Sequence, residues 1–254
     1  MYLIIGGDGL IGEALSRDFS SRGIQYHAST RDSEKVSNNN PYIDLGNCRN
    51  YQPDDNYSSA IICAAMSKHH DCDKYPNETY RVNCSGVINI VRKLNANGTH
   101  VVFLSTSQVF DGEKKYRSPK DLKSPVSEYG RQKSYVEDVI LSLGNTSVLR
   151  LSKVVYKSFP LFVDLKNKLI NGKVINAYKD YYFAPVDLDK VVKKIVNIID
   201  NNMHGIYHVP SGNDVTYYNY ALSIAHSLKV SPNYVNGVNS EFDGIRSKFN
   251  SLKE

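Results

Sequence analysis

The sequence predicts an α/β protein built on a doubly wound parallel sheet that carries helices on both faces. Short apolar runs alternate with segments of helical periodicity over residues 1–151, and this order of elements builds parallel sheets. Glycines stand at the ends of several of these segments. With 254 residues, 41% of them hydrophobic, the chain is long enough to bury a core.

Strands are expected where a short apolar run ends at a glycine or a polar residue. The predicted strands are residues 2–5, 24–28, 42–45, 59–65, 100–104, 147–151 and 205–209. Helices are expected where apolar residues recur at intervals of three or four. The predicted helices are residues 10–19, 77–94, 126–143, 161–170, 188–199 and 216–228. Two polar segments that contain proline, residues 30–41 and 111–125, are predicted as loops.

The composition excludes several classes of protein. Lys and Arg number 31 against 26 Asp and Glu, so the net charge is +5, too mild for a nucleic-acid-binding surface. No apolar stretch approaches the length of a membrane-spanning helix. The N-terminus lacks the features of a signal peptide, and the four cysteines lack metal-site spacing. We therefore expect a protein of the reducing cytoplasm with no nucleic-acid or membrane partner.

A cluster of potential metal ligands occupies residues 69–73, which read His-His-Asp-Cys-Asp. The side chains of contiguous residues point in different directions, whereas structural zinc ligands come in spaced pairs. We therefore predict a solvated loop at this position and no metal site.

Glycines at the first turn predict a dinucleotide site. Gly6, Gly9 and Gly12 directly follow the first predicted strand and open the first predicted helix. A tight turn, close approach of a pyrophosphate to backbone N–H groups, and close packing of helix on strand each require a residue without a Cβ. The helix N-terminus adds a favourable dipole for the anion. The alternative is a glycine-rich turn that binds no ligand.

The domain organisation follows from this site and from a change in pattern after residue 151. We expect residues 1–151 to form a dinucleotide-binding, Rossmann-like domain that later elements at about residues 186–209 complete. Residues of about 152–185 and 210–254 are expected to form a small C-terminal lobe that binds substrate. The last twenty residues are polar and poorly patterned.

The end of the second predicted strand bears on the choice of cofactor. An acidic residue there binds the ribose 2′-hydroxyl of NAD, whereas an arginine accommodates the 2′-phosphate of NADP. Residues 28–32 read Ala-Ser-Thr-Arg-Asp. Arg31 favours NADPH, and Asp32, twenty residues after Gly12, leaves NADH open.

A Tyr-x-x-x-Lys pair predicts the catalytic groups of a carbonyl reductase. A tyrosine can protonate the alkoxide that hydride transfer produces, provided that a nearby cation lowers its pKa. Two such pairs occur. Pro119 lies between Tyr116 and Lys120 and breaks any shared helix face. Tyr129 and Lys133 lie in a predicted helix without proline, so only this pair is geometrically credible.

A hydroxyl that polarises the substrate carbonyl is expected at the end of the preceding strand, because ligands bind at the carboxyl edge of such sheets. Residues 105–107 read Ser-Thr-Ser. Thr106 is the preferred candidate, and Ser105 and Ser107 are the alternatives.

These motifs resemble a known family. Residues 6–12, Gly-Gly-Asp-Gly-Leu-Ile-Gly, resemble the first turn of extended short-chain dehydrogenase/reductases. Residues 105–112, Ser-Thr-x-x-Val-Phe-Asp-Gly, and residues 129–133, Tyr-Gly-Arg-x-Lys, resemble the dTDP-4-dehydrorhamnose reductases. Shorter matches follow in family order at Ala64-Ala65, Pro76, Val82-Asn83, and residues 149–152, 184–188 and 205–208.

The resemblance implies roles for individual residues. Cofactor contacts are implied, besides the glycines, Arg31 and Lys133, for Leu10, Ile11, Asp44, Leu45, Ala64 and Ala65, with Asp44 and Leu45 at the adenine. Asn83, Ser107 and Gln108 are implied on the substrate side. Thr106, Tyr129 and Lys133 correspond to the carbonyl-binding, proton-donating and ribose-anchoring groups of the family.

The resemblance also implies an activity, namely the NADPH-dependent reduction of a keto nucleotide sugar for surface polysaccharide synthesis, with a homodimer left open. One alternative is a nucleotide-sugar epimerase or dehydratase that holds NAD tightly. Another is a non-catalytic, dinucleotide-binding regulatory subunit. The basic loop at residues 111–124 either clamps the substrate diphosphate or is a solvated surface loop.

Overall fold

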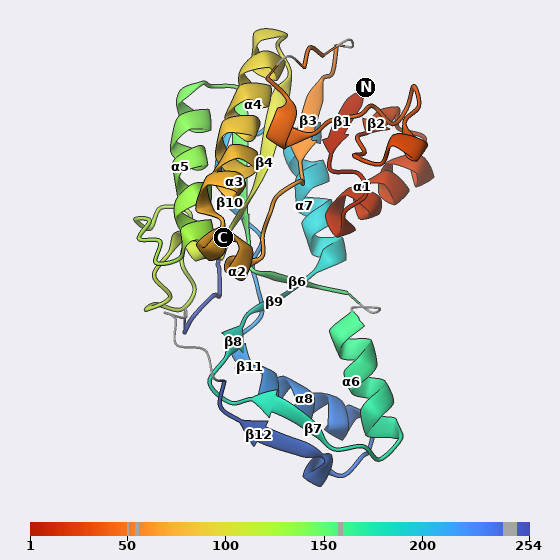
Figure 1. Ribbon diagram of the computed structural model, residues 1–254, viewed down its shortest axis with the longest axis vertical. Coiled ribbons are helices and arrows are strands. Elements are labelled where there is room, and N and C mark those ends of the chain that lie inside the picture. The colour runs from red at the N-terminus through yellow and green to blue at the C-terminus, as the bar shows by residue number, and fades with distance from the viewer. Residues whose placement is uncertain (50, 54–55, 157–159, 241–247) are drawn as a thin grey trace.

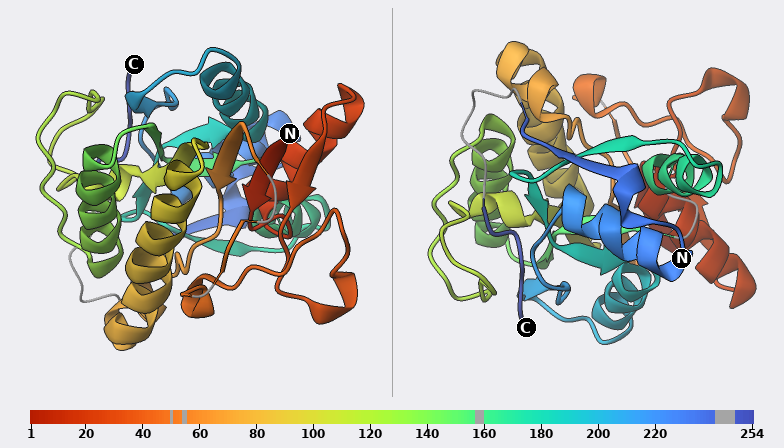
Figure 2. Two further views of the ribbon diagram at one scale, coloured as in Figure 1. Left: turned by 90° about the horizontal axis from the view of Figure 1, so that it is seen from above. Right: turned by 90° about the horizontal axis from the view of Figure 1, so that it is seen from below.

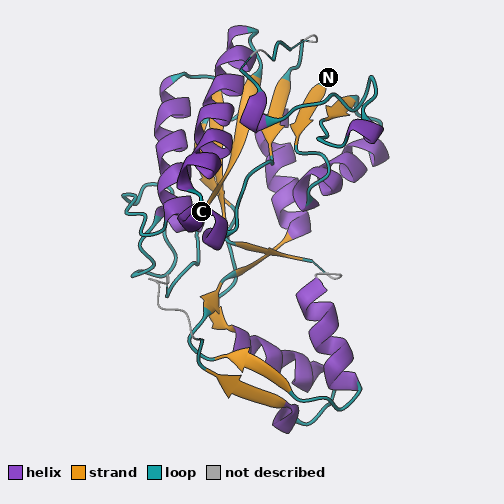
Figure 3. Cartoon of the chain, viewed as in Figure 1, coloured by secondary structure: helices purple, strands orange, loops and turns teal. Residues whose placement is uncertain are grey.

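A six-stranded parallel sheet forms the centre of the upper part of the molecule in a computed structural model, which describes residues 1–49, 51–53, 56–156, 160–240 and 248–254 (Figures 1 and 3). The strand order is β10-β5-β4-β3-β1-β2, and every pairing is parallel. The strands are β1 (Tyr2–Ile5), β2 (Tyr26–Ala28), β3 (Ser59–Ile62), β4 (His100–Thr106), β5 (Thr146–Leu151) and β10 (Gly205–His208). The doubly wound fold class is therefore confirmed.

Helices cover both faces of this sheet because successive strand side chains point to opposite sides. Ile4, Ile61 and Val102 pack on one side with apolar residues of two helices, α1 (Leu10–Ser21) and α7 (Leu188–Asp200). Leu3, Ile5 and Phe103 pack on the other side with α4 (Val87–Ala96) and α5 (Glu128–Ser142). Figure 2 shows these layers from above. Strands buried on both faces explain the continuous apolar runs in the sequence.

The helix expected at residues 77–94 contains an irregularity that periodicity did not predict. It begins as α3 (Pro76–Tyr80), continues as a π-helical segment, η3 (Arg81–Gly86), and ends as α4. A π-helical segment shifts the register of the side chains that follow it, and such segments are frequent at functional sites. Asn83 lies in this segment.

A smaller group of elements lies below the sheet in Figure 1. Its core contains Leu169, Ile175, Ala221 and Val235, and its elements are α6 (Pro160–Ile170), β7 (Ile175–Tyr178), β8 (Tyr182–Phe183), β11 (Val215–Thr216), α8 (Tyr217–Ser227), η5 (Pro232–Tyr234) and β12 (Val235–Val238). Two short parallel strands, β6 (Lys153–Val155) and β9 (Pro185–Asp187), connect it to the sheet. The predicted domain limits stay a prediction, and residues 157–159 and 241–247 of the predicted lobe lie outside the described residues.

Two predictions of local structure are wrong. Residues 42–45 do not form a strand: Tyr42 makes one isolated bridge with Thr30, and a 3₁₀ turn, η2 (Leu45–Asn47), follows. The Asp44 side chain caps this turn by accepting a hydrogen bond from the Gly46 amide. Residues 69–73 are not a loop but lie in a short helix, α2 (His69–Lys74), which buries Cys72 completely.

The end of the chain packs on the sheet-bearing part of the molecule. Leu252 pairs with Arg117 in an isolated parallel bridge and is buried against Val109 and Phe110. The polar composition of this segment concealed the contact, because one buried leucine creates no periodic pattern.

Two buried histidines predict a loss of stability in acid. Burial, with a smaller contribution from His204, lowers the pKa of His100 from its ordinary 6.5 to about 4. Burial, with the charge of Arg150, also lowers the pKa of His208 to about 4. The unfolded chain therefore takes up protons at a higher pH than the folded chain, and stability that is complete above pH 6.5 falls as the pH approaches 4.

We expect the free energy of unfolding to fall by up to about 3 kcal/mol per histidine between pH 6.5 and 4. Chemical denaturation across this range measures it, with His100→Gln as a variant whose profile should be flatter. A free energy of unfolding that does not change between pH 7 and 5 would contradict the assignment.

Candidate active site

A cavity of about 570 Å³ lies at the carboxyl edge of the sheet. Residues at or after the ends of β1, β3, β4 and β5 line it, including Leu10, Ala65, Thr106 and Ser152. The strand order reverses between β1 and β3, and ligands of open α/β sheets bind at such a reversal. The position of the cavity therefore agrees with the site that the sequence motifs predict.

Different constraints act on two glycines of the first turn. A Cβ on Gly12 would overlap the Gly6 carbonyl, so the bare backbone lets α1 approach β1. A Cβ on Gly9 would meet nothing closer than the Gly6 carbonyl oxygen at 3.4 Å. Packing therefore requires Gly12 but does not require Gly9, whose exposed backbone at the start of α1 fits the approach of a ligand phosphate.

The end of β2 contacts the glycine turn through hydroxyl groups. Ser29 Oγ accepts a hydrogen bond from the Gly6 amide at 3.0 Å, and Thr30 Oγ1 donates one to Asp8 at 2.6 Å. Lys35 Nζ lies 3.5 Å from carboxylate oxygens of Asp8 and Asp32. Arg31 is exposed beside this group. No local pattern in the sequence pointed to Lys35, because the approach of this lysine to Asp8 depends on the 3₁₀ turn that contains it, η1 (Ser33–Lys35).

The remaining predicted cofactor residues have different environments. Leu10, Ile11 and Ala65 line the cavity, and Ala64 lies against Gly6. Asp44 is half-buried as the cap of η2. The Leu45 side chain is buried in the core, so only its backbone is left for a contact with an adenine, and that expectation stays a prediction.

The start of α5 brings Tyr129 and Lys133 to the cavity. Ser127 caps the helix by accepting a hydrogen bond from the Gly130 amide at 3.1 Å. A Cβ on Gly130 would overlap the Gln108 carbonyl. The glycine beside Tyr129 thus allows the helix to lie directly against the segment that follows Thr106, the last residue of β4.

Burial determines the charge properties of this pair. Lys133 Nζ donates a hydrogen bond to the Leu104 carbonyl at 2.9 Å and lies 5.8 Å from the centroid of the Tyr129 ring. Burial lowers the pKa of Lys133 to about 8, and the charge of Glu137 opposes this shift. Burial raises the pKa of Tyr129. The lowering that we expected for the pKa of Tyr129 is therefore absent from this structure, because loss of hydration disfavours the charged phenolate.

Thr106 is better placed than the neighbouring serines to bind a carbonyl. Its Oγ1 accepts a hydrogen bond from the Gln108 amide at 3.2 Å, which leaves the hydroxyl proton to be donated into the cavity. Ser105 Oγ instead donates to Glu137 at 2.5 Å. Ser107 lines the cavity, as does Gln108, whose side chain donates to Asn250 at 2.7 Å.

Asn83 supports the site from behind. Its side chain accepts a hydrogen bond from the Met66 amide at 2.8 Å and donates to the Met66 carbonyl and to Gln132, each at 2.9 Å. It is buried and does not line the cavity. The expectation of a substrate contact is therefore wrong, and Asn83 holds the segment after β3 in place.

A buried carboxylate connects the elements that carry the site. Glu137 accepts hydrogen bonds from Ser105 and from Arg150, whose Nη2 lies 2.8 Å from Oε2. Arg150 Nη1 also donates to His208 Nε2 at 3.4 Å, which leaves His208 Nδ1 as the donor to the Lys253 carbonyl. This chain of contacts joins β4, β5, α5, β10 and the C-terminal segment.

The basic loop does not reach the cavity. Arg117 pairs with Asp111 at 2.5 Å, Lys114 with Asp121 at 3.5 Å, and Lys123 with Asp138 at 2.7 Å. The residues that line the cavity include none from this loop. These three cations therefore neutralise nearby acids, and a diphosphate clamp receives no support.

Sequence analysis also missed the wall of the cavity that the smaller part of the molecule provides. Tyr181, Tyr182 and Tyr217 line it, together with Lys153 of β6 and His69 of α2. The adjacent tyrosines at 181–182 were the available signal, but nothing in the sequence brings them next to Thr106.

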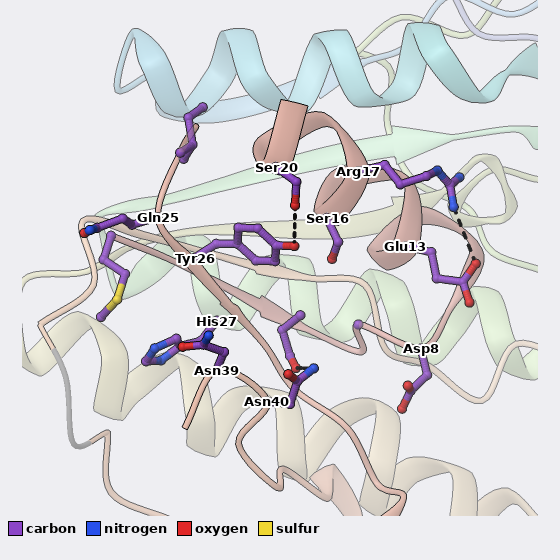
Figure 4. A pocket seen from close by; sticks show the side chains of 14 residues that line it. Asp8, Glu13, Ser16, Arg17, Ser20, Gln25, Tyr26, His27, Asn39 and Asn40 are labelled. Atoms are coloured by element: carbon purple, nitrogen blue, oxygen red, sulfur yellow. Dashed lines mark hydrogen bonds and ion pairs between the residues drawn. The ribbon is translucent and has the colours of Figure 1, made fainter. Parts of the chain in front are cut away.

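A second cavity, of about 840 Å³, lies beside the outer edge of the sheet (Figure 4). Its wall includes Met1 and Gln25, which precede β1 and β2, and Gly7 and Asp8, which follow β1, so it extends along the edge of the sheet. Its polar groups pair with each other: Arg17 with Glu13 at 3.7 Å, and Ser20 with Tyr26 at 2.9 Å. This groove offers none of the predicted catalytic groups.

Two further properties concern the described residues only. Of the helices in this part of the chain, none combines the length and apolarity that a membrane crossing needs. No three His, Cys, Asp or Glu side chains within it converge to hold a metal ion.

Comparison with known proteins identifies relatives over nearly the whole chain. The family model described as RmlD substrate binding domain matches residues 1–246. The dTDP-4-dehydrorhamnose reductase of Aggregatibacter actinomycetemcomitans is 24% identical over 232 residues, which cover 87% of this chain and 77% of that protein. The methionine adenosyltransferase 2 subunit beta of Bos taurus is 22% identical over 251 residues, which cover 92% and 73%.

A solved structure shares the fold. The dTDP-4-dehydrorhamnose reductase of Bacillus anthracis, solved in complex with NADP, superimposes with a TM-score of 0.84 at 21% identity, covering 99% of this chain and 88% of that one.

Serine substitutions at Gly9 and Gly12 separate packing from ligand binding. We expect Gly12→Ser to lower the free energy of unfolding by about 1–3 kcal/mol, because its Cβ overlaps the Gly6 carbonyl. Gly9→Ser should change stability by less than about 0.5 kcal/mol, since serine caps helices well, yet weaken dinucleotide binding. Thermal unfolding and fluorescence titration measure the two effects. A Gly9→Ser protein that binds the dinucleotide normally would contradict this division.

Glu137→Gln tests the buried carboxylate. We expect a loss of about 3–5 kcal/mol in the free energy of unfolding, because Arg150 would keep a buried charge without a counter-charge. Asp138→Asn is the matched control on the same helix: Asp138 pairs with Lys123 but is 69% exposed, so its loss should cost less than about 1 kcal/mol. Equal effects of the two substitutions in urea denaturation would disprove the special role of Glu137.

Proposed function

The chain belongs to the RmlD substrate binding domain family, and on this premise we propose that it is an NADPH-dependent reductase of a keto nucleotide sugar. One observation carries the proposal. A single cavity at the carboxyl edge of the sheet combines the residues after the glycine turn with Thr106, Tyr129 and Lys133. These groups are what hydride transfer to a carbonyl needs: a dinucleotide platform, a hydrogen-bond donor and a proton donor.

The binding groups fit a dinucleotide phosphate. The open backbone at Gly9 and the N-terminus of α1 suit the pyrophosphate. The exposed cations Arg31 and Lys35 suit a 2′-phosphate, and the relative solved with NADP supports the same choice. NADH stays open because Asp8 and Asp32 lie within 3.5 Å of Lys35. When bound, the reduced nicotinamide supplies the hydride.

The protein groups act on the substrate carbonyl and its proton. Thr106 donates its hydroxyl proton in a hydrogen bond to the carbonyl oxygen and so stabilises the charge that develops there. Tyr129 keeps its proton at neutral pH and gives it up as the oxygen becomes an alkoxide, which is the stronger base. Lys133 holds the ribose and places a positive charge 5.8 Å from the centroid of the Tyr129 ring. Its hydrogen bond to the Leu104 carbonyl fixes its direction.

The cellular setting is also part of the proposal. The four cysteines are free, and three of them are buried, which suits the cytoplasm. Tyr80 and Tyr135 are 41% and 46% exposed and stack with ring centroids 5.9 Å apart on the outer side of α3 and α5. This aromatic pair suits the contact surface of a homodimer.

A regulatory subunit is the second candidate. The similarity to methionine adenosyltransferase 2 subunit beta extends over 92% of this chain, and that protein is named as a subunit. Binding of NADPH without turnover of any keto nucleotide sugar would favour this candidate. Turnover with no net consumption of NADPH would instead favour an epimerase.

Tyr129→Phe tests the proton donor, and the second Tyr-x-x-x-Lys motif supplies a control. We expect Tyr129→Phe to reduce kcat for a dTDP-linked 4-keto sugar by roughly 10²–10⁴-fold, because the alkoxide loses its proton source. NADPH affinity should stay unchanged. Tyr116→Phe should keep full activity, since Tyr116 bonds to Asn213 outside the cavity. NADPH oxidation followed by absorbance gives both values, and full activity of Tyr129→Phe would overturn the assignment.

A further inference from the structure

The cavity has a second lysine besides Lys133 of α5. Lys153 is the first residue of β6, and its backbone amide donates a hydrogen bond to the Ala184 carbonyl of the segment leading into β9 at 3.2 Å. Its side chain lines the same cavity as Thr106 and Tyr129. β6, which pairs with β9, thus places a lysine in the cavity that contains the proposed reacting groups.

The described lining of the cavity contains basic side chains and no acidic ones. Its described lining contains Lys133, Lys153 and His69 but neither Asp nor Glu. Lys133 is directed to the Leu104 carbonyl. Lys153 is exposed to solvent, although partial burial by neighbouring atoms lowers its pKa, and its charge attracts an anion that enters the cavity.

His69 connects Lys153 to the reacting centre. The His69 ring lies 5.7 Å from the Tyr129 ring, centroid to centroid. Burial lowers the pKa of His69, Asp73 opposes this, and the charge of Lys153 adds to the lowering. His69, Tyr129 and Lys153 line the same cavity, so Lys153 lies in the neighbourhood of the other two residues. A group that Lys153 binds would therefore lie close to the substrate carbonyl.

Tyrosines complete this wall. Tyr181 and Tyr217 line the cavity with ring centroids 5.3 Å apart. Aromatic faces with hydroxyl groups suit the mixed apolar and polar surface of a sugar. The wall therefore offers an aromatic surface to a sugar ring and a lysine to an oxyanion.

We propose that Lys153 is a specificity-determining residue that binds an oxyanion of the substrate next to the carbonyl that is reduced. This inference rests on the proposed function. Two parts of a nucleotide sugar present such an oxyanion: a carboxylate on the sugar itself, or the diphosphate folded toward the sugar. If Lys153 binds the sugar carboxylate, acidic nucleotide sugars are the preferred substrates.

Binding to the NADPH-loaded protein tests the proposal. The probes are UDP-glucuronate, UDP-glucose and UDP, with the dTDP-linked forms as a second set, in isothermal titration. The variants are Lys153→Met, which removes the charge while keeping the length, and Lys153→Arg, which retains the charge. Lys120→Met is the matched control, because Lys120 is an exposed lysine outside the cavity.

If Lys153 binds a sugar carboxylate, UDP-glucuronate should bind about tenfold tighter than UDP-glucose, and Lys153→Met should remove this difference in affinity. If Lys153 binds the diphosphate, Lys153→Met should weaken the binding of all three probes by a similar factor of about ten. In both cases the Lys153→Arg and Lys120→Met variants should bind the probes with affinities close to those of the unchanged protein.

Equal affinities in the unchanged protein and Lys153→Met, or no binding of any probe to the NADPH-loaded protein, would overturn the inference. Failure of the unchanged protein to bind NADPH would contradict the proposed function instead, so the two failures can be distinguished by titrating NADPH first.

Discussion

The contact between Glu137 and Arg150 is the interaction on which the site depends. Both side chains are almost completely buried, with exposed fractions of 0% and 1%, and Arg150 donates to both carboxylate oxygens. Such a pair tolerates little displacement, because each charge has lost its hydration. It fixes α5 against β5, while Ser105 attaches the end of β4 to the same carboxylate. Thr106, Tyr129 and Lys133 lie on these elements.

The charge of Glu137 also acts on Lys133, one helical turn earlier. It raises the pKa of the lysine against the larger lowering by burial, so the ammonium form persists in a site that would otherwise favour the neutral amine. Close packing of α5 at Gly130 brings this lysine and Tyr129 to the strand end. The structural carboxylate and the proposed catalytic groups are therefore parts of one arrangement.

Local patterns in the sequence predicted most of the sheet, because a parallel strand buried on both faces is a visible apolar run. They also separated Tyr129 and Lys133 from Tyr116 and Lys120, since a proline inside a motif is a local obstacle. Contacts between distant segments were not predictable in this way. The helix at residues 69–74, the packing of Leu252 beside Phe110, and the approach of Tyr217 and Lys153 to Thr106 depend on tertiary structure.

The central claim, that this cavity transfers hydride from NADPH to a sugar carbonyl, is tested most directly by isotope transfer. The protein is incubated with a keto nucleotide sugar and NADPH that carries deuterium at C4 of the nicotinamide, and the product sugar is examined by mass spectrometry and NMR. We predict a hydroxyl-bearing carbon that has gained deuterium from one face of the nicotinamide only. A product that gains no deuterium from NADPH labelled on either face of C4, or a sugar that is returned unchanged, would contradict the account.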